Sequence, residues 1–314
     1  MKTKPLGNSG LHVSELCLGC LDFGTRLDRD ASFELLDTYY EAGGRFLDTA
    51  NNYAFWAPNG VGGESEKMLG EWLRARGRRH DMTIATKVGA QPTRPGAGFE
   101  AAEGLAAHAI ARAAEASLSR LGIDHIDLYY AHIQDDAVAQ EETLSAFERL
   151  REDGKIRAIA CSNHSLERII AAKGISERNG WSSYCCLQQR YSYLQPMAGA
   201  DFGPQKTIDS TLETYLQTSD IPLISYATLL GGAYETGVLP KAYDTVENRA
   251  RLDRLRRAAQ ILGLTPSQAA LAWARLSSGN VIPLLAASSA ERLKQGIATL
   301  TVTAESLSSA LSTD

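Results

Sequence analysis

Eight short apolar segments recur along the chain, and their spacing restricts the possible folds strongly. Each segment has the length of a strand and is largely apolar rather than strictly alternating, which is typical of parallel strands covered on both faces. The segments are ELCLG (15–19), RFLDTA (45–50), MTIATKV (82–88), HIDLYYAH (125–132), IRAIACS (156–162), YCCLQQR (184–190), IPLISYA (221–227) and NVIPLLAA (280–287).

Segments with apolar residues at helical spacing lie between these runs. In the last of them, Thr265 stands at a cap position, Pro266 in the first turn, and Gln268 completes a capping box. The predicted helices cover residues 30–44, 65–77, 106–122, 143–155, 248–263 and 265–276.

Strands that alternate with helices in this way predict a (β/α)8 TIM barrel of the α/β class, with residues 1–314 as a single barrel domain. An open doubly wound sheet is the alternative. That fold normally has a glycine-rich phosphate loop after its first strand, and GCLDFG (19–24) lacks this pattern. The stretch KPLGNSGLHVS (4–14) predicts an N-terminal β-hairpin, whereas the polar segment 303–314 is expected to be frayed.

Composition and charge exclude several classes of partner. The chain has 32 Lys and Arg against 37 Asp and Glu, so no basic excess favours nucleic acid. No apolar run approaches the length of a membrane span, and the first ten residues lack the apolar region of a signal peptide. We therefore expect a cytoplasmic protein without a nucleic-acid or membrane partner, and the sequence leaves its oligomeric state open.

The five cysteines are expected to be small buried thiols. Most of them lie inside apolar runs, and no pair has the spacing of zinc ligands, so no metal site is predicted. A cysteine nucleophile is the less favoured alternative, for which Cys20 and Cys161 lie closest to strand ends.

Polar side chains gather where the strands end, which is where barrel enzymes carry their chemistry. We expect the second strand to end with Asp48, the third near Lys87 and the fourth at His132, and Tyr53 follows in the loop after Asp48. Each residue alone has an ordinary structural explanation, but their convergence at one mouth favours a catalytic site.

These four residue types suit a proton-transfer site. A free tyrosine has a pKa of about 10, and lowering it by two units needs roughly 2.7 kcal/mol. One close ammonium can supply this, because such a pair is worth up to about 4 kcal/mol at 4 Å in a medium of moderate dielectric constant. We therefore expect that Asp48 holds Lys87, that Lys87 lowers the pKa of Tyr53, and that a neutral His132 orients a carbonyl oxygen.

At these residues the chain resembles the aldo-keto reductase family over nearly its whole length. FLDTANNY (46–53) is similar to the family's Asp-Thr-Ala-x-x-Tyr signature, and SLSRLGIDHIDLYYAH (117–132) to the motif that ends in the catalytic histidine. GESEKMLGEWL (63–73) and DGKIRAIACSNHS (153–165) resemble two further family motifs. The resemblance implies that Asp48, Tyr53, Lys87 and His132 are the catalytic residues.

The resemblance also implies NADP(H) as cofactor and a small carbonyl compound as substrate. Ser162, Asn163 and Gln188 would hold the nicotinamide carboxamide, and Tyr226 would stack on the ring. The remaining cofactor contacts carried over to this sequence are Gly19, Cys20 and Leu21 against the cofactor, Ala227, Thr228 and Leu229 at the pyrophosphate, and Ser288, Ser289 and Arg292 at the 2′-phosphate. Separately, we expect the rim of the substrate pocket to include Phe23, Tyr53, Trp56 and Arg190, with the alternative that Trp56 only packs on its own loop.

Some positions depart from the family pattern. Ser289 stands where members often carry Lys or Arg, Gly296 where Asn is common, and His164 where phenylalanine is common.

The leading hypothesis is an NADPH-dependent reductase of aldehydes or ketones. The alternatives are a regulatory subunit that binds the cofactor with slow or vestigial turnover, and a barrel isomerase or lyase that uses Asp48 and Lys87 without a nicotinamide.

Overall fold

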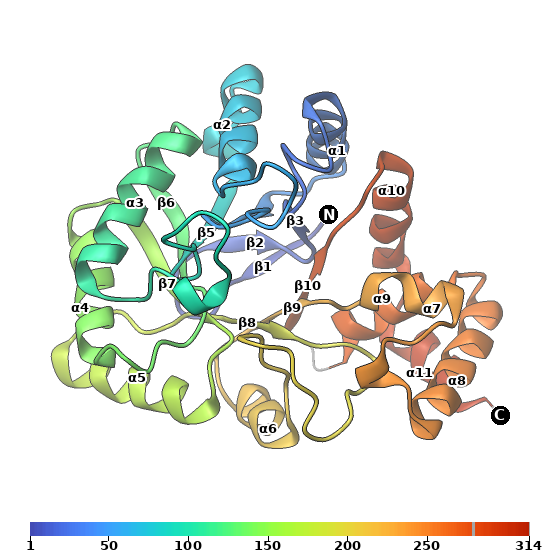
Figure 1. The fold of residues 1–314 in the computed structure, drawn as a ribbon. Coiled ribbons are helices and arrows are strands. Elements are labelled where there is room, and N and C mark those ends of the chain that lie inside the picture. Colours follow the sequence, from blue (N-terminus) through green and yellow to red (C-terminus); the bar gives the residue numbers. More distant parts are fainter. Residues whose placement is uncertain (278–279, 314) are drawn as a thin grey trace.

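The computed structural model describes residues 1–277 and 280–313, and its centre is a closed barrel of parallel strands (Figure 1). The order around the barrel is β10-β3-β4-β5-β6-β7-β8-β9. The barrel strands are β3 (Cys17–Gly19), β4 (Phe46–Asp48), β5 (Thr83–Val88), β6 (Ile126–Ala131), β7 (Ile156–Ser162), β8 (Leu187–Arg190), β9 (Leu223–Tyr226) and β10 (Val281–Leu285). Each lies within one of the eight apolar runs, so the prediction of a (β/α)8 barrel is confirmed.

Helices surround the barrel and cover its outer face (Figure 1). They are α1 (Arg29–Glu41), α2 (Glu64–Arg76), α3 (Ala107–Leu121), α4 (Gln140–Glu152), α5 (Leu166–Asn179), α6 (Ser210–Thr218), α7 (Ala233–Thr236), α8 (Val246–Leu262), α9 (Pro266–Leu276), α10 (Ala290–Ala298) and α11 (Ala304–Ser312). The six predicted helices correspond to α1–α4, α8 and α9, and the capping box at Thr265 is present. The helices α5 to α7, α10 and α11 were not among these six.

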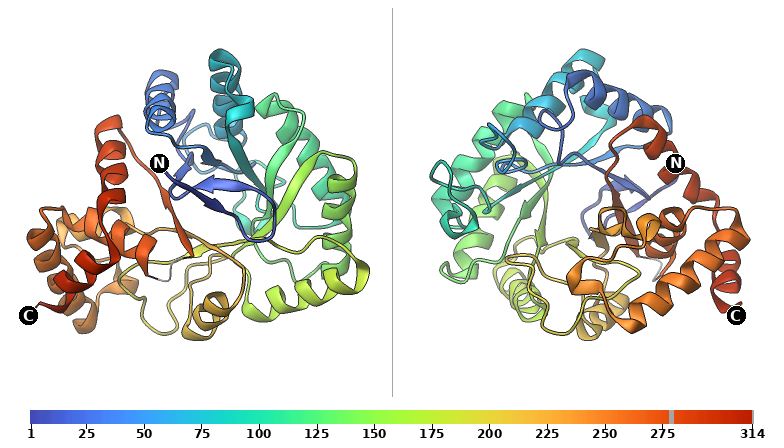
Figure 2. Two further views of the ribbon diagram at one scale, coloured as in Figure 1. Left: turned by 180° about the vertical axis from the view of Figure 1, so that it is seen from behind. Right: turned by 45° about the vertical axis from the view of Figure 1, so that its right-hand side comes forward.

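The N-terminal hairpin is formed as predicted, by β1 (Thr3–Pro5) and the antiparallel β2 (His12–Ser14). Seen from behind in Figure 2, it crosses one end of the barrel. Leu6, Leu11 and Val13 pack with the side chains that fill the barrel interior. The hairpin therefore closes the bottom of the barrel with an apolar plug, and the opposite end is left for chemistry.

The last helix corrects one prediction. Residues 303–312 are not frayed, because Thr303 caps α11 through a capping box with Ser306. Leu307 and Ala310 are buried, and α11 packs against α8. A short helix that looks polar in sequence still buries the few apolar residues of one face. Asp314 lies outside the described residues.

Candidate active site

The alternation of side chains along parallel strands brings the polar residues into the barrel. Phe46, Ala85 and Leu128 belong to the cluster that fills the interior, whereas Leu47 and Ile84 pack outward against the helices. Because successive residues of a strand point to opposite faces, positions an even number of residues further along also point inward. Those positions at the strand ends are Asp48, Lys87, His132, Ser162, Gln188 and Tyr226.

Asp48 and Lys87 form an ion pair that is fully buried. Asp48 ends β4, Lys87 is the residue before the last in the neighbouring β5, and the side chains of both are 0% exposed. Lys87 Nζ donates to Asp48 Oδ2 at 2.6 Å and to the carbonyl oxygen of Thr49 at 2.8 Å. A buried ammonium needs such compensation, because taking it out of water is costly.

Tyr53 completes this cluster from the turn that follows β4. Its hydroxyl oxygen accepts from Lys87 Nζ at 2.6 Å, and the hydroxyl donates to Asp48 Oδ2 at 3.1 Å. The next residue, Ala54, has a φ of 66°, in the left-handed region that a non-glycine residue seldom adopts. The predicted meeting of acid, lysine and tyrosine is therefore present in the structure.

The pKa of Tyr53 differs from the expectation. Burial raises the pKa of the Tyr53 hydroxyl well above its usual range, and the Asp48 carboxylate raises it further. The expected net lowering of this pKa is therefore not found, because desolvation and the negative charge on Asp48 raise it. Burial also lowers the pKa of Lys87, which Asp48 opposes. Tyr53 is thus protonated at neutral pH.

His132 follows β6 and lies beside Tyr53. The two rings meet edge to face, with centroids 5.9 Å apart and planes at 69°. Burial, together with the Lys87 charge, lowers the pKa of His132 well below its ordinary value, so the imidazole is neutral. Its Nδ1 is buried and has no hydrogen-bond partner among the described residues.

Gln188, on β8, is a further partner of the cluster that the sequence did not reveal. Its Nε2 donates to Asp48 Oδ1 at 2.7 Å, although the two residues are 140 positions apart. Asp48 therefore accepts from Lys87, Tyr53 and Gln188 together. The strand period was the available signal, since it places Gln188 and not Gln189 inside the barrel.

Asn163 and Tyr226 meet at the mouth near this cluster. Asn163 has a φ of 58°, and its Oδ1 accepts from the Tyr226 hydroxyl at 2.6 Å and from Lys206 N at 3.1 Å. Its Nδ2 donates to His132 O and to Ser162 Oγ, each at 3.0 Å. The structure thus brings Ser162, Asn163 and Tyr226 together with the backbone of His132, from the ends of β6, β7 and β9.

Two segments near the mouth correspond to the predicted phosphate contacts. After β9, Ala227 and Leu230 have positive φ angles, as have Gly231 and Gly232, and Leu230 N and Gly232 N donate within the loop to Ala227 O and Leu229 O. Thr228 Oγ1 lies 3.2 Å from Ser225 Oγ, and Leu229 packs against two apolar clusters. These contacts fix the loop that starts at the end of β9.

The second segment is the start of α10. Ser289 caps this helix by accepting from Arg292 N, and Arg292 Nη1 donates to Ser288 Oγ at 3.1 Å. All three side chains are exposed. Hydroxyls, a guanidinium and the positive end of a helix form a donor set that fits a phosphate group.

The residues after β3 lie close to the barrel wall. A Cβ added at Gly19 would overlap Leu284 Cδ2, so the Leu284 side chain packs directly on the backbone there. Cys20 is buried, and Leu21 is half-buried. Burial raises the pKa values of the Cys20 and Cys161 thiols well above the ordinary range, which argues against the alternative of a cysteine nucleophile.

The three predicted rim residues other than Tyr53 differ in their positions. Phe23 is 1% exposed within the apolar layer that contains Phe33, so the prediction that it lines the pocket rim is corrected by its burial. Trp56 is 44% exposed and packs edge to face on Phe55, at 5.0 Å between centroids. Arg190 donates to Gln205 Oε1 at 2.9 Å.

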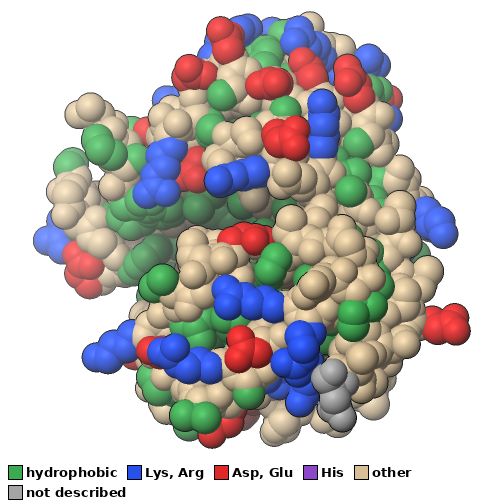
Figure 3. All heavy atoms as spheres, turned by 90° about the vertical axis from the view of Figure 1, so that its right-hand side faces the viewer, with side chains coloured by type: hydrophobic (Ala, Val, Ile, Leu, Met, Phe, Trp, Pro, Cys, Tyr) green, Lys and Arg blue, Asp and Glu red, His purple; other side chains and the backbone are tan. Residues whose placement is uncertain are grey.

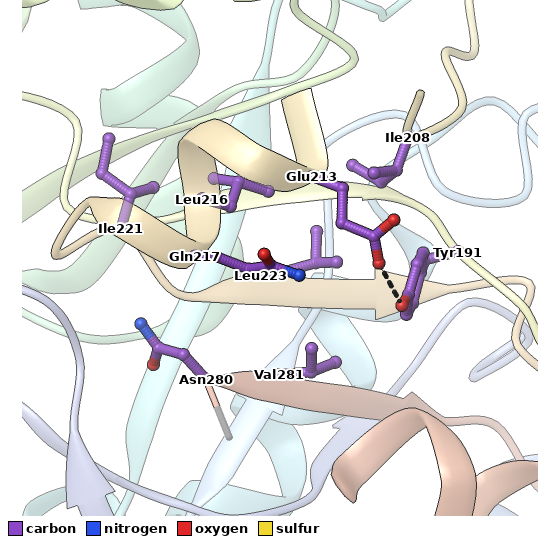
Figure 4. Close-up of a pocket in the computed structure, with 9 residues that line it drawn as sticks. All are labelled: Tyr191, Ile208, Glu213, Leu216, Gln217, Ile221, Leu223, Asn280 and Val281. Carbon is purple, nitrogen blue, oxygen red and sulfur yellow. Dashed lines mark hydrogen bonds between the residues drawn. The ribbon is translucent and has the colours of Figure 1, made fainter. Parts of the chain in front are cut away.

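A cleft opens on the side of the molecule that lies to the right in Figure 1, and hydrophobic side chains line much of its inner wall (Figure 3). Clefts with apolar walls and a few polar groups are the usual sites for small organic ligands. The small cavity in Figure 4 is different. It lies beneath α6, where Tyr191 donates to Glu213 Oε1 at 2.8 Å, and the candidate residues are not among those lining it.

A closed (β/α)8 barrel with a buried lysine, acid and tyrosine at one mouth, and a neutral histidine beside them, defines a barrel enzyme equipped to transfer a proton. The profile of the aldo/keto reductase family matches residues 15–310. The chain therefore belongs to the aldo/keto reductase family. It is accordingly an oxidoreductase, and this family generally uses nicotinamide cofactors and acts on small carbonyl compounds.

Individual relatives extend over nearly all of the chain. An uncharacterised oxidoreductase, YrpG, of Bacillus subtilis is 30% identical, over 93% of this chain and 89% of the relative. The norsolorinic acid reductase stcV of Emericella nidulans is 28% identical, over 94% and 76%. An aryl-alcohol dehydrogenase of Pestalotiopsis microspora is 26% identical, over 94% and 77%.

Two further observations concern the described part of the chain. Within residues 1–277 and 280–313, no helix is both long and apolar enough to cross a membrane. The same residues include no group of three His, Cys, Asp or Glu side chains placed to bind a metal ion.

Proposed function

We propose that the protein is an NADPH-dependent reductase that converts an aldehyde or a ketone to an alcohol, with Tyr53 as the general acid. The observation that carries this proposal is the contact of one tyrosine hydroxyl with both Lys87 and Asp48 at the barrel mouth. Tyr53 is part-buried, so part of its side chain stays open to solvent.

The raised pKa of Tyr53 is compatible with this role. It keeps the hydroxyl protonated at neutral pH, so the proton is present when the carbonyl oxygen becomes an alkoxide. An alkoxide is a stronger base than a phenolate, and the proton transfer is therefore favourable. The phenolate that remains lies 2.6 Å from Lys87 Nζ, and at an effective dielectric constant of about 20 the attraction between two such charges is about 6 kcal/mol.

Asp48 and His132 support this step in different ways. Asp48 holds the Lys87 ammonium in place and opposes the loss of its charge through burial. His132 is neutral, and a neutral imidazole can donate one hydrogen bond to the substrate oxygen without competing for the proton. Its edge-to-face contact with Tyr53 supports a shared role of the two side chains at one substrate oxygen.

The residues at the mouth fit a nicotinamide dinucleotide. When bound, a reduced nicotinamide supplies the hydride. We assign Ser162, Asn163 and Gln188 to the carboxamide, Tyr226 to the ring, and the backbone of residues 19–21 and 227–229 to the central part. Arg292, with Ser288 and Ser289, offers charged and polar donors for the 2′-phosphate, which favours NADPH over NADH.

Asn163 and Gln188 have protein partners in this structure, so carboxamide binding requires some exchange of hydrogen bonds. The Asn163 amide already makes four, to Tyr226, Lys206, His132 and Ser162. If each hydrogen bond that is lost within the protein is replaced by one to the carboxamide, the net change in free energy is small.

The test is a screen of aliphatic and aromatic aldehydes and ketones with NADPH and with NADH, followed by the loss of absorbance of the reduced cofactor. Aromatic aldehydes such as benzaldehyde are included because one relative is named an aryl-alcohol dehydrogenase. We expect carbonyl-dependent oxidation of NADPH. No oxidation with any compound, despite cofactor binding, would favour the regulatory-subunit alternative.

Tyr53→Phe is the matched variant, because it removes only the hydroxyl. We expect kcat to fall by roughly 10²- to 10⁴-fold, the usual worth of general acid catalysis, while NADPH still binds. A Tyr53→Phe protein that reduces its best substrate within about threefold of wild type would contradict the assignment of Tyr53.

A further inference from the structure

The turn that carries Tyr53 is fastened to the neighbouring loop through two asparagines. Asn51 Nδ2 donates to Glu103 Oε1 at 2.6 Å, and Asn52 Nδ2 donates to the carbonyl oxygen of Ala90 at 3.3 Å. Both acceptors belong to the loop of residues 89–106, which joins β5 to α3. The backbone N–H of Asn51 also donates to Lys87 O at 3.2 Å.

The same carboxylate oxygen of Glu103 holds the end of the strand that carries Lys87. Gly89 N donates to Glu103 Oε1 at 3.0 Å, only two residues after Lys87. Gly89 has a φ of 108°, and an added Cβ would lie 2.7 Å from Leu105 Cδ2, so the backbone takes a path there that only glycine tolerates. One oxygen atom therefore links the Tyr53 turn to the end of β5.

Glu103 is itself held in position. Its backbone N–H donates to Gln91 O at 2.8 Å, within a loop that folds back on itself. Burial raises the pKa of the Glu103 carboxyl, against the hydrogen bonds from Asn51 and Gly89 and the charge on Arg112. The surroundings of Glu103 thus do not favour its ionised form overall. We therefore expect the Asn51 and Gly89 donors to depend on the position of the Glu103 oxygen rather than on its negative charge.

The Tyr53 turn needs such support because of its backbone. Ala54 adopts a left-handed conformation, which costs about 1–3 kcal/mol for a non-glycine residue and persists only when contacts around it enforce it. In an active site, a displacement of about 1 Å can reduce the rate roughly 100-fold.

We propose that Glu103 is a positioning residue that sets the distance between the Tyr53 hydroxyl and the Lys87 ammonium through its shared oxygen. This inference rests on the proposed function, in which Tyr53 donates the proton. Glu103 acts through Asn51 and Gly89 and does not touch the reacting atoms.

Three variants of the full chain test it. Glu103→Ala removes both hydrogen bonds, whereas Glu103→Gln retains an oxygen that can accept them. Asp135→Ala is the matched control: Asp135 accepts from Leu105 N at 2.8 Å and from Ala137 N at 2.9 Å, so it fastens the same loop without contacting the Tyr53 turn. We measure kcat and KM with NADPH and benzaldehyde, or the screened compound that wild type reduces fastest.

For Glu103→Ala we expect kcat to fall by roughly 10- to 100-fold with KM changed less than about threefold, since alignment rather than binding is lost. Glu103→Gln and Asp135→Ala should stay within about threefold of wild type in kcat. An Ala variant with wild-type kcat, or an equal loss in Glu103→Gln or in Asp135→Ala, would overturn the proposal.

Hydrogen exchange provides a readout that needs no turnover. The amides of residues 49–54 should exchange at least tenfold faster in Glu103→Ala, and at the wild-type rate in Glu103→Gln and Asp135→Ala. If wild type reduces no carbonyl compound, the proposed function fails while this measurement still decides whether Glu103 holds the turn. Wild-type exchange rates of these amides in Glu103→Ala would show that Glu103 does not hold the Tyr53 turn.

Discussion

A double-mutant cycle on the buried pair of Asp48 and Lys87 should give different results for stability and for activity. Substitution of either residue should lower both, and the double variant should recover stability but not activity. The two charged atoms are 2.6 Å apart, and both side chains are 0% exposed. At an effective dielectric constant of about 20, their attraction is about 6 kcal/mol, but the removal of each ion from water costs several kcal/mol. The pair is therefore close to neutral for stability as a whole, whereas a single remaining charge has no compensation.

The single substitutions Asp48→Asn and Lys87→Met should each lower the free energy of unfolding by about 3–5 kcal/mol, because each leaves one buried charge unpaired. The double variant should recover most of this loss. In Asp48→Asn the pKa of Lys87, already lowered by burial, falls further because the carboxylate that opposes the shift is gone. The ammonium then becomes neutral and no longer stabilises the Tyr53 phenolate.

Activity should not recover with stability. We expect each single variant to lose roughly 10²- to 10⁴-fold in kcat, and the double variant to be no worse than the poorer single one, since the residues act as a unit. Urea unfolding monitored by circular dichroism gives the stabilities, and NADPH oxidation gives the rates.

The exposed pair of Lys155 and Glu115, whose charged atoms are 2.5 Å apart, is the matched control. Glu115→Gln should change stability by less than about 1 kcal/mol, as for exposed pairs in general. Stability losses that simply add in the double variant of Asp48 and Lys87, or an Asp48→Asn protein with nearly wild-type kcat, would refute this reasoning.

Two further predictions concern the cofactor and acid stability. Arg292→Ala should raise the dissociation constant for NADPH by roughly 10- to 150-fold, the worth of a charged hydrogen bond, and leave that for NADH almost unchanged; equal weakening of both in a fluorescence titration would mean that Arg292 only supports its loop. Burial lowers the pKa of His164 to about 4, below its unfolded value of about 6.5, so the folded state resists protonation and loses stability as the pH falls between these values. His164 should account for about 2 kcal/mol of the stability lost between pH 7 and pH 5, and His164→Phe should remove this part; an equally acid-sensitive variant in urea unfolding at both pH values would show that other groups are responsible.

The sequence predicted much of the fold because its signals are local. A parallel strand covered on both faces has to be a short apolar run, and a helix on its outer side has to show the 3.6-residue period, so strands and most helices could be read from adjacent residues. The helix α11 could not be predicted in this way. Its two buried residues, Leu307 and Ala310, are too few to indicate a helix unless the packing against α8 is known.

The site residues also divide into those with a local signal in the sequence and those that only packing reveals. Asp48, Lys87 and His132 stand within two residues of the ends of apolar runs, and the strand period already directs them to one side. Phe23, by contrast, looks like any loop aromatic, and only the packing of α1 and α2 shows that it is buried.

The sequence by itself determined the number and order of the strands and the presence of an acid, a lysine, a tyrosine and a histidine at one mouth, because these depend on spacing along the chain. The tertiary structure decided the bond from Gln188 to Asp48, the link through Glu103, and the raised pKa of Tyr53. Each of these depends on distances between segments remote in sequence and on how much water the closed barrel excludes. Desolvation and through-space charge act over a few ångströms in three dimensions, and no local pattern of residues encodes them.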